Sequence, residues 1–554
     1  MKPTQYLSIL TLLVPALFLK PMPGVADESV AREVVLVQAG NATQALEPGD
    51  RWETQGDALV GSGVGHTLRP PLQIGEGDFT ISIRLSLDGL DRTAASFVVN
   101  HDSHFGFDGS AGTLFIEGPL FGQSTNLDRA SDHLVAGEAF DFSVKRTDGT
   151  LRFAINHKVV HEVITGDVAL GTIALRPHRS TMRVRAWEVA GDVHRVEMPE
   201  LIDVFRTGED GYHTFRIPAI VRAANGDLLA FAEGRVSGQS DAGDIDLVMK
   251  RSSDGGATWG RLTRVADFGR GTVGNPAPVV DTQSGDVVLV AVLQPEGVHE
   301  GHIRHGEGYR DPCVLRSTDH GVTWSEPVSL VETADRPDWR WYATGPCHAI
   351  QLRHGPHAGR LVVPANFSTD GGAGSDYLGA HALLSDDAGQ TWRIGAVDDS
   401  HVGDNRINPN ESTVVELADG TLLFNARDQH GSSRATRLST RSTDGGESFT
   451  RPYAPVEDLT APVCQGALLG VELDGQQVIV YSSPGVWNAR EEMKLRYSTD
   501  QGATWQDGPT LYTGSSAYSD LVNLDNATVG CLFEIDNYER IVFTTLGVET
   551  SQAE

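Results

Sequence analysis

STDHGVTW occupies residues 317–324, and four other segments repeat its order of a serine, an aspartate, a glycine and an aromatic residue. The aspartates of the five repeats are Asp254, Asp319, Asp387, Asp444 and Asp500. They are separated by 65, 68, 57 and 56 residues. Each interval is long enough for one four-stranded sheet with its loops, and such internal repetition is typical of propeller blades. We therefore predict an all-β fold built on a β-propeller.

Each repeat has the composition of a tight turn between two strands. The Ser and Asp side chains can hydrogen-bond to nearby backbone, and the glycine supplies a positive φ. The aromatic ring can pack between neighbouring sheets. Because each aspartate is then committed to its own turn, we interpret the repeats as scaffold and not as catalytic groups.

A second motif, FRIP at residues 215–218, lies upstream of the repeats and is followed by the apolar run 219–221. The FRIP motif and the five repeats, which are known as Asp-boxes, together resemble the sialidase (neuraminidase) superfamily over about residues 201–548. The resemblance implies a six-bladed β-propeller. It also implies an exo-α-sialidase, a glycoside hydrolase that releases terminal sialic acids from glycans.

The chain of 554 residues is too long for one ordinary hydrophobic core. Its first 26 residues read as an export signal, with Lys2, an apolar run at 6–19 and the small residues 24–26. The apolar run is short for a bilayer span. We expect a secreted or periplasmic protein after removal of residues 1–26, with no stable membrane insertion.

Residues 27–198 predict a separate module of short strands. Apolar and polar residues alternate in the runs 79–87, 140–144, 151–155 and 182–187, which are separated by Gly, Asp and Asn turns. This pattern favours an antiparallel β-sandwich. The module loosely resembles concanavalin-like or laminin-G-like jelly rolls, so it either binds sugar or only packs against the propeller.

A polar connector is expected at 191–199, and the propeller is expected to fill residues 199–554. Within the N-terminal module, His101, His104 and Asp108 crowd one stretch of sequence and form a candidate ligand site, although short polar loops of this kind are usually only solvated.

The net charge of −30 and the pI near 4.9 argue against nucleic acid and anionic membranes as partners. Any attraction for an anionic sugar must come from a local group of arginines. We predict no metal and no cofactor, because no Cys/His spacing indicates a zinc site. The cysteines are either paired, in one of three combinations, or buried as free thiols; they are Cys313, Cys347, Cys464 and Cys531.

Cleavage of a sialic acid poses an electrostatic problem, because the reacting carbon bears a carboxylate that repels an attacking Asp or Glu. Sialidases use a tyrosine instead. In this chain Tyr518, within AYSDL at 517–521, matches the tyrosine motif of the family. Glu411 lies 16 residues before Arg427 and matches the base that activates the tyrosine. Glu416 has an odd separation from Glu411 in the same strand, so we expect it to face the opposite side.

Three arginines match the family's clamp for the sugar carboxylate: Arg216 of the FRIP motif, Arg427 and Arg490. Guanidinium groups bind carboxylates through paired hydrogen bonds. Glu534 resembles the glutamate that braces the first arginine. Arg235 and Asn275 occupy positions that contact the far side of the sugar ring in relatives.

Asp241, Asp244 and Asp246 compete for the role of general acid and base in the loop after the first blade. Asp241 lies 13 residues before Asp254, as the family's acid does, and is favoured. It must hold a proton before cleavage, so burial on substrate closure is expected to raise its pKa. A dense aromatic stretch, with Trp339, Trp341 and Tyr342, forms either core packing, which is favoured, or a pocket wall.

The resemblance implies a retaining mechanism. Asp241 protonates the departing oxygen, Tyr518 attacks after Glu411 accepts its proton, and Asp241 then activates water. Two alternatives stay open: a trans-sialidase, including an intramolecular one, and a sialic-acid-binding propeller without catalysis. The second would lack one of the three catalytic residues. Linkage preference, the sugar variant accepted and the oligomeric state are not indicated by the sequence.

Overall fold

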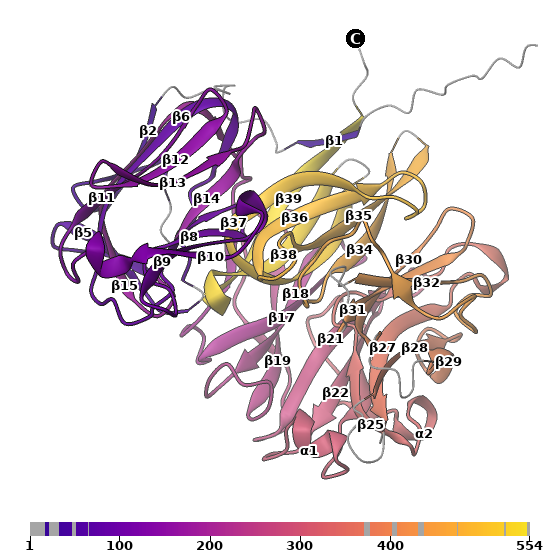
Figure 1. Ribbon diagram of the computed structural model, residues 1–554. Coiled ribbons are helices and arrows are strands. Elements are labelled where there is room, and N and C mark those ends of the chain that lie inside the picture. Colours follow the sequence, from indigo (N-terminus) through magenta and orange to yellow (C-terminus); the bar gives the residue numbers. More distant parts are fainter. Residues whose placement is uncertain are drawn as a thin grey trace, which may run out of the picture.

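The computed structural model describes residues 17–20, 33–46, 51–64, 66–369, 377–400, 407–429, 437–473, 475–525 and 528–550. The chain forms two bodies, an N-terminal module and a larger group of sheets that follows it in sequence (Figure 1). Of the expected export signal, only β1 (Leu17–Lys20) is described, and it pairs with the last strand of the chain. The rest of residues 1–26 lies outside the described residues, so the signal stays a prediction.

The N-terminal module is one hydrogen-bonded network of strands in the order β10-β9-β8-β7-β14-β6-β11-β12-β13, joined through β15 to β2 and β5. Its strands are β2 (Glu33–Gln38), β3 (Asn41–Ala42), β4 (Trp52–Gln55), β5 (Ala58–Ser62), β6 (Leu72–Leu87), β7 (Ser96–Val99), β8 (Ser103–Gly106), β9 (Thr113–Glu117), β10 (Thr125–Arg129), β11 (Phe140–Thr147), β12 (Thr150–Ile155), β13 (Lys158–Ile164), β14 (Gly171–Arg176) and β15 (Thr181–Arg195). The four alternating runs of the sequence all lie in these strands, as predicted.

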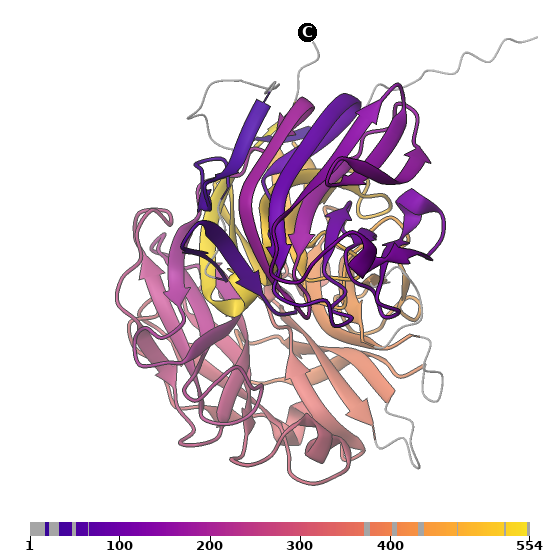
Figure 2. The same cartoon turned by 60° about the vertical axis from the view of Figure 1, so that its left-hand side comes forward.

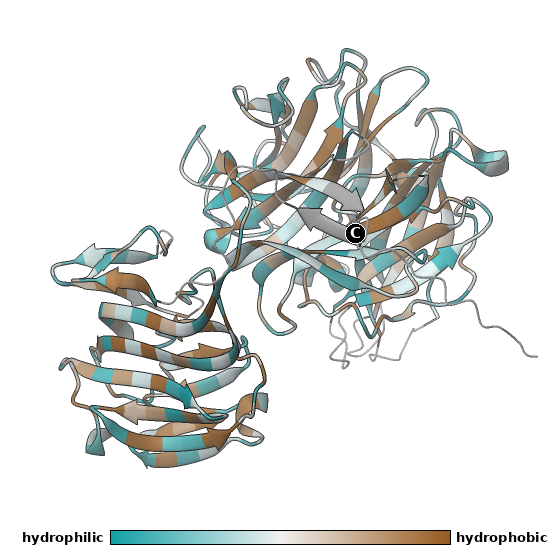
Figure 3. Cartoon of the chain, turned by 90° about the horizontal axis from the view of Figure 1, so that it is seen from above, coloured by the Kyte–Doolittle hydropathy of each residue, from teal (hydrophilic) through white to brown (hydrophobic). Residues whose placement is uncertain are grey.

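Alternation along these strands builds the core of the module. In β11 the residues Phe140, Phe142 and Val144 are buried, whereas their neighbours are more exposed. The buried side chains include the stacked rings of Phe105 and Phe153, whose centroids are 5.0 Å apart. Apolar and polar bands alternate along the strands of the module in Figure 3. Since successive side chains of a strand point to opposite faces, one face of β11 packs inward and the other is more exposed.

The prediction of a connector at 191–199 is wrong for residues 191–195, which belong to a strand. β15 continues to Arg195 and pairs with β6 throughout. A register shift between Gly191 and Val193 interrupts the strand, and Gly191 has φ 108°. Such a bulge breaks the period-two pattern, so the end of this strand was not visible in the sequence.

The candidate ligand site at His101, His104 and Asp108 is not one site. Asp108 is buried and accepts a hydrogen bond from the backbone N of Thr93 (3.0 Å). His104 contacts the hydroxyl of Ser96 inside the module. His101 instead reaches the larger body.

The larger body consists of antiparallel strands that follow one another along the chain. The strands are β16 (Ile202–Arg206), β17 (Thr214–Arg222), β18 (Leu228–Arg235), β19 (Ile245–Ser252), β20 (Thr263–Ala266), β21 (Thr272–Val280), β22 (Val287–Gln294), β23 (Asp311–Ser317), β24 (Val328–Ser329), β25 (Trp339–Thr344), β26 (Ile350–Gln351), β27 (Leu361–Thr369), β28 (Tyr377–Ser385), β29 (Arg393–Asp398), β30 (Pro409–Glu416), β31 (Leu422–Asp428), β32 (Arg437–Ser442), β33 (Ala454–Pro455), β34 (Ala467–Leu473), β35 (Gln476–Pro484), β36 (Glu491–Ser498), β37 (Gln506–Asp525), β38 (Thr528–Ile535) and β39 (Arg540–Thr550). The strands that open successive groups, namely β17, β21, β25, β30, β34 and the second half of β37, contact one another in a closed series.

The two ends of this series are joined by hydrogen bonds. β16 follows the N-terminal module in the chain, yet it pairs with β39 near the C-terminus. Buried residues of β16, β18 and β39, including Phe205, Leu228 and Phe543, share one apolar cluster. The first and last parts of the body are therefore held together both by backbone pairing and by packing.

Helices contribute little, as the sequence indicates. The helical segments are α1 (Glu300–Arg304), α2 (Val331–Ala334) and the short 3₁₀ turns η1 (Pro119–Phe121), η2 (Ala130–Asp132), η3 (Gly355–His357) and η4 (Asp536–Tyr538). Over the residues described, no helix has the length and apolar character that a bilayer crossing requires.

The five Asp-boxes are turns, as predicted. Each begins on the last residue of a strand, here Ser442 at the end of β32. Asp444 accepts hydrogen bonds from the Ser442 hydroxyl (2.7 Å) and from the backbone N and the hydroxyl of Ser448 (3.0 and 2.5 Å). The Ser442 hydroxyl accepts a bond from the backbone N of Gly446 (2.9 Å). The same contacts recur at the other four boxes.

The box glycines also lie against the preceding group of strands. Gly256 has φ 97°, and a Cβ on it would stand 2.0 Å from the ring of Phe543 in β39. Gly446 similarly faces Leu384 of β28. Only glycine meets both demands, a left-handed backbone and a close approach. The boxes thus determine how neighbouring groups of strands pack.

We expect Asp444→Ala to lower the free energy of unfolding by about 1–3 kcal/mol, because hydrogen bonds to an ionised carboxylate are lost. Asp444→Asn, which keeps an acceptor oxygen, should lose less. The check is the thermal unfolding midpoint of each variant beside the parent. An unchanged midpoint for Asp444→Ala would show that the box does not stabilise the fold.

Candidate functional site

A bulge of one residue occurs at the same place in five of the strands that open the groups. The register of each strand slips by one residue relative to its partner: between Arg216 and Ala219 in β17, Gly274 and Ala277 in β21, Trp339 and Tyr342 in β25, Pro409 and Ser412 in β30, and Ser516 and Ser519 in β37. β-Bulges redirect side chains and are frequent beside active sites. The bulged residues Ile217, Asn275, Trp341, Glu411 and Tyr518 all line one pocket.

This central pocket encloses about 580 Å³, part of it open to solvent. It is strongly polar, and the side chains that line it come from most of the groups of strands. Its lining residues are Ile217, Glu233, Arg235, Asp241, Asn275, Glu300, Arg310, Trp341, Ala343, Asn366, Asn410, Glu411, Arg427, Gln429 and Tyr518. Six of the nine predicted site residues are therefore in one place, although they span nearly the whole larger body.

Tyr518, Glu411 and Arg427 form a closed triangle of contacts. The Tyr518 hydroxyl donates to Glu411 Oε1 at 2.5 Å. Arg427 Nη1 lies 3.0 Å from the Tyr518 oxygen, to which it donates, and 2.9 Å from Glu411 Oε2. Glu416 lies elsewhere and accepts bonds from the backbone N of Arg353 and His354, so it faces away from this triangle as predicted.

The proton of the Tyr518 phenol is held firmly. Burial raises the pKa of Tyr518 well above its usual value, and this outweighs the opposing effect of the Arg427 charge. The phenol is therefore neutral at physiological pH, and the nucleophilic phenolate requires a base in contact with it. Glu411 is placed for that task.

Glu534 is fully buried and joins three groups from different parts of the chain. Its Oε1 accepts from Arg216 Nε (2.7 Å) and from the backbone N of Ile217 (2.8 Å). Its Oε2 accepts from the backbone N of Tyr518 (3.1 Å). Glu534 therefore braces Arg216, as the resemblance implied, and also holds the strand segment that presents Tyr518.

The bulge that carries Arg216 has an unusual backbone. Ile217 has φ 60°, a conformation that a β-branched residue adopts only under constraint. Pro218 follows and has no N–H to lose from the ladder at this point. The bond from Ile217 to Glu534 stabilises the distortion, and the guanidinium of Arg216 is placed 5.3 Å from the centre of the Tyr518 ring.

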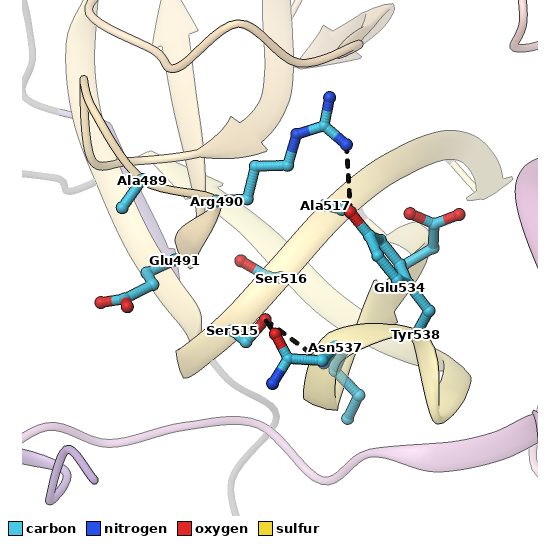
Figure 4. A pocket seen from close by; sticks show the side chains of 10 residues that line it. Ala489, Arg490, Glu491, Ser515, Ser516, Ala517, Glu534, Asn537 and Tyr538 are labelled. Atoms are coloured by element: carbon cyan, nitrogen blue, oxygen red, sulfur yellow. Dashed lines mark hydrogen bonds between the residues drawn. The ribbon is translucent and has the colours of Figure 1, made fainter. Parts of the chain in front are cut away.

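Arg490 is the third guanidinium of the group, at 5.4 Å from the centre of the Tyr518 ring. It lies in the connection between β35 and β36 and lines a second cavity beside the central pocket (Figure 4). Arg490 Nη1 donates to the Tyr538 hydroxyl at 3.1 Å, and Nη2 donates to the carbonyl of Val463 at 3.0 Å. The three predicted clamp arginines therefore surround the same phenol.

Tyr538 was not found by sequence reasoning. Its ring lies under the Arg216 guanidinium at 3.8 Å, and its hydroxyl contacts Arg490, so it separates two of the clamp arginines. It sits in η4, where Asp536, Asn537 and Tyr538 all have positive φ (55°, 52° and 73°). No local sequence pattern indicated this conformation.

Asp241 lies at the rim of the pocket, with 79% of its side chain exposed. Its Oδ1 is 2.7 Å from Arg235 Nη2, and Arg235 also pairs with Glu233 at 2.7 Å. Partial removal from water raises the pKa of Asp241, but the charges of Arg235 and Arg216 outweigh this and hold the pKa below its usual value. The rise expected on substrate closure stays a prediction.

The two competing aspartates do not line the pocket. Asp246 is buried and accepts a hydrogen bond of 2.6 Å from the Tyr212 hydroxyl. Asp241 is the member of the three that faces Arg235 and the pocket.

The far side of the pocket holds Asn275 and an arginine that the sequence did not single out. The backbone N of Asn275 donates to Glu233 (3.0 Å), and its side-chain oxygen accepts from Arg310. Arg310 is buried and its guanidinium lies over the Trp341 ring at 3.9 Å. Burial lowers the pKa of Arg310 to about 10. The sequence signal for this residue is the length of the segment 295–310, because long connections in a propeller often carry site residues.

The aromatic stretch divides between core and pocket. Trp339 stacks on Phe367 with centroids 4.0 Å apart, and Tyr342 is fully buried, so both are core residues as favoured. For Trp341 the prediction of core packing is wrong, because this side chain lines the pocket. The bulge between Trp339 and Tyr342 explains why neighbours in sequence face different surroundings.

All four cysteines are buried and free. Of the two possibilities left by the sequence, the structure has the unpaired one. Cys464 packs beside Tyr518 and Ile217 in a small apolar cluster under the arginines.

The chain is similar in sequence to known sialidases. A family model described as a BNR repeat-like domain matches residues 226–531. The sialidase of Micromonospora viridifaciens is 33% identical over 348 residues, which are 60% of this chain and 51% of that protein. The match therefore spans about half the length of this relative. The exo-alpha-sialidase of Aspergillus fumigatus is 31% identical over 59% of this chain and 80% of its own length.

A solved structure has a similar fold. The Hadza microbial sialidase Hz136 superimposes with a TM-score of 0.56 over 86% of this chain and 94% of its own, at 23% identity. The sialidase fold is a β-propeller, so the closed series of sheets in this chain is of propeller type.

We expect Glu534→Ala to destabilise the protein by about 3–5 kcal/mol, because Arg216 would stay buried without its carboxylate. Glu534→Gln keeps the shape and two acceptor lone pairs, and should retain more of the stability. Urea unfolding followed by tryptophan fluorescence measures both. If Glu534→Ala unfolds at the urea concentration of the parent, Glu534 is not the brace.

Proposed function

The chain belongs to the sialidase family, and we propose that it is an exo-α-sialidase that hydrolyses terminal sialic acids from glycoproteins, glycolipids and oligosaccharides. One observation carries this proposal: three guanidinium groups surround a phenol that is hydrogen-bonded to a carboxylate. The cations suit the sugar carboxylate, and the phenol suits the carbon beside it.

The substrate carboxylate would bind among Arg216, Arg427 and Arg490. The chain carries a net charge of −30, so attraction for an anionic sugar depends on this local cluster. Each arginine is already fixed by a partner on the protein, which reduces the ordering cost of binding. Nucleic acid is not a proposed partner.

The proposed chemistry proceeds with retention in two displacements. In the first, Glu411 accepts the phenol proton, the Tyr518 oxygen forms a bond to the anomeric carbon, and the glycosidic oxygen leaves with the proton of Asp241. In the second, Asp241 takes a proton from water, the water oxygen bonds to the anomeric carbon, and the Tyr518 oxygen departs and regains its proton from Glu411. The hydrogen bond from Tyr518 to Glu411 supports the first transfer.

Asp241 must carry a proton for the first displacement, whereas its ion pair with Arg235 favours the ionised form. Substrate that contacts Arg235 would weaken this pair, and removal of water would then raise the pKa of Asp241. Arg235 and Asn275 are proposed to contact the far side of the sugar ring.

The architecture proposed for the whole chain has three parts: a signal peptide at 1–26, a concanavalin-like β-sandwich at 27–198 and a six-bladed propeller at 199–554. The pairing of β16 with β39 supports a ring closed between its two ends. We also propose a secreted or periplasmic location, for which the apolar run at 6–19 and the small residues 24–26 are the support.

Tyr518→Phe should lower kcat for sialyl-lactose by at least about a thousandfold, because it removes the nucleophilic oxygen. Binding of free sialic acid, measured by calorimetry, should persist, since the three arginines stay. Tyr481→Phe is a matched control that removes a buried hydroxyl outside the pocket. NMR of the parent digest should show the α-anomer of free sialic acid first; a transferred or anhydro sugar would indicate a trans-sialidase, and no product a binding protein.

Arg235→Gln should move the alkaline limb of kcat/KM to higher pH. Arg235 lowers the pKa of Asp241, so its removal raises that pKa and keeps the acid protonated to higher pH. The absolute rate should fall because a sugar contact is lost. Arg235→Lys keeps the charge and should leave the limb in place. If the alkaline limb of kcat/KM in Arg235→Gln lies at the same pH as in the parent, Asp241 is not the general acid.

A further inference from the structure

The N-terminal module contacts the larger body at the two residues that follow Arg490. Arg69 Nη2 lies 2.9 Å from Glu491 Oε2, and His101 Nε2 lies 2.8 Å from Glu492 Oε2. The Arg69 side chain is 2% exposed and that of Glu491 is 16% exposed, so this pair is largely buried. Thr172 of the module joins the two side chains, with its hydroxyl 3.1 Å from Arg69 Nη1 and 3.3 Å from His101 Nε2.

Glu491 depends on the module for its countercharge. Among the described residues, both ion-pair partners of Glu491 come from the module, namely Arg69 and His101. Glu492 has a weaker partner on its own strand, Lys494 at 3.6 Å. Although burial by itself raises both pKa values, the contacts with His101 and Arg69 bring the pKa of Glu491 to about 2, and those with His101 and Lys494 bring that of Glu492 to about 2. Both carboxylates are therefore ionised in a site that water reaches poorly.

The backbone of this segment needs outside support. Glu492 has φ 61°, which costs a non-glycine residue about 1–3 kcal/mol. The register of β36 against β37 shifts on both sides of Met493. Arg490 itself precedes the strand, and its backbone carbonyl accepts a hydrogen bond of 2.9 Å from the backbone N of Ser516, two residues before Tyr518.

Arg490 and Glu491 point in opposite directions from this segment. In Figure 4 Arg490 extends toward Tyr538, whereas Glu491 extends away from it. Adjacent side chains of an extended segment alternate in this way. The contacts that hold Glu491 on one side of the segment therefore also fix the backbone from which Arg490 extends toward the Tyr518 phenol on the other side.

We propose that the N-terminal module is a working part of the active site: Arg69 and His101 hold Glu491 and Glu492, and thereby position Arg490 for the carboxylate of the substrate. This inference rests on the proposed sialidase function. Arg69 and His101 are positioning residues, because they act through Arg490 and lie outside the central pocket.

The test compares full-length Arg69→Met and His101→Gln with the parent on 3′-sialyllactose. Each variant should raise KM, and the inhibition constant of free sialic acid, by about tenfold, the loss expected when one charge-assisted hydrogen bond is misplaced. kcat should change less, since a carboxylate clamp acts on bound substrate and transition state alike. Arg69→Lys should recover part of the affinity.

A matched control breaks an ion pair within the N-terminal module that touches no residue beside the site. Arg183 Nε lies 2.8 Å from Asp88 Oδ1 in a more exposed pair. Arg183→Met should leave KM and the inhibition constant within twofold of the parent. Thermal unfolding of every variant identifies any that is misfolded, and His101→Gln, which removes the less buried partner, carries the test if Arg69→Met does not fold.

A double-mutant cycle separates positioning of Arg490 from general support of the fold. If Arg69 acts through Arg490, then Arg69→Met should have little further effect on the inhibition constant in an Arg490→Lys background. Equal effects in both backgrounds, or parent-like KM values for folded Arg69→Met and His101→Gln, would overturn the inference. A parent protein that does not release sialic acid would instead refute the proposed function.

Discussion

The buried carboxylate of Glu534 is the interaction on which the rest of the site depends. It accepts hydrogen bonds from Arg216, from the backbone of Ile217 and from the backbone of Tyr518. These groups belong to β17 and β37, at opposite ends of the larger body in sequence. One side chain therefore ties the first clamp arginine to the proposed nucleophile. Without it, a guanidinium would be buried with no countercharge beside a strained backbone.

The bulges explain how strands can deliver these side chains to one point. In a regular strand, neighbours point to opposite faces, and the pairing of the sheet decides the direction. An extra residue in β17, β21, β25, β30 and β37 frees one side chain from that constraint. The Asp-boxes have a different role, because they fix how neighbouring groups of strands pack. Rigid packing at the turns leaves the bulged positions well defined.

Charge is distributed unevenly in this protein. The chain is strongly acidic, yet five arginines lie in or beside one pocket: Arg216, Arg235, Arg310, Arg427 and Arg490. Carboxylates pair with three of these cations, Arg216, Arg235 and Arg427, whereas Arg490 donates to the Tyr538 hydroxyl and the Val463 carbonyl. Arg310 bonds only to amide oxygens among the described residues. The arrangement keeps the cations close together without neutralising them completely, so an anionic ligand can still compete for them. The N-terminal module also contributes, because its Arg69 and His101 contact the acidic residues beside Arg490.

The sequence by itself determined the repeated turns, the alternating strands and, through the resemblance, most of the residues that meet at the pocket. These features are local: the Asp-box contacts span four residues, and strand periodicity is visible in short windows. The tertiary structure alone decided that Tyr538 separates two arginines, that Trp341 leaves the core for the pocket, that Arg310 lies opposite the clamp and that Arg235 lowers the pKa of Asp241. It also decided that β15 runs through the expected connector and that His101 contacts Glu492. The physical reason is that bulges, buried ion pairs and contacts between separate bodies depend on residues far apart in the chain, and no short window of sequence records which of them will meet.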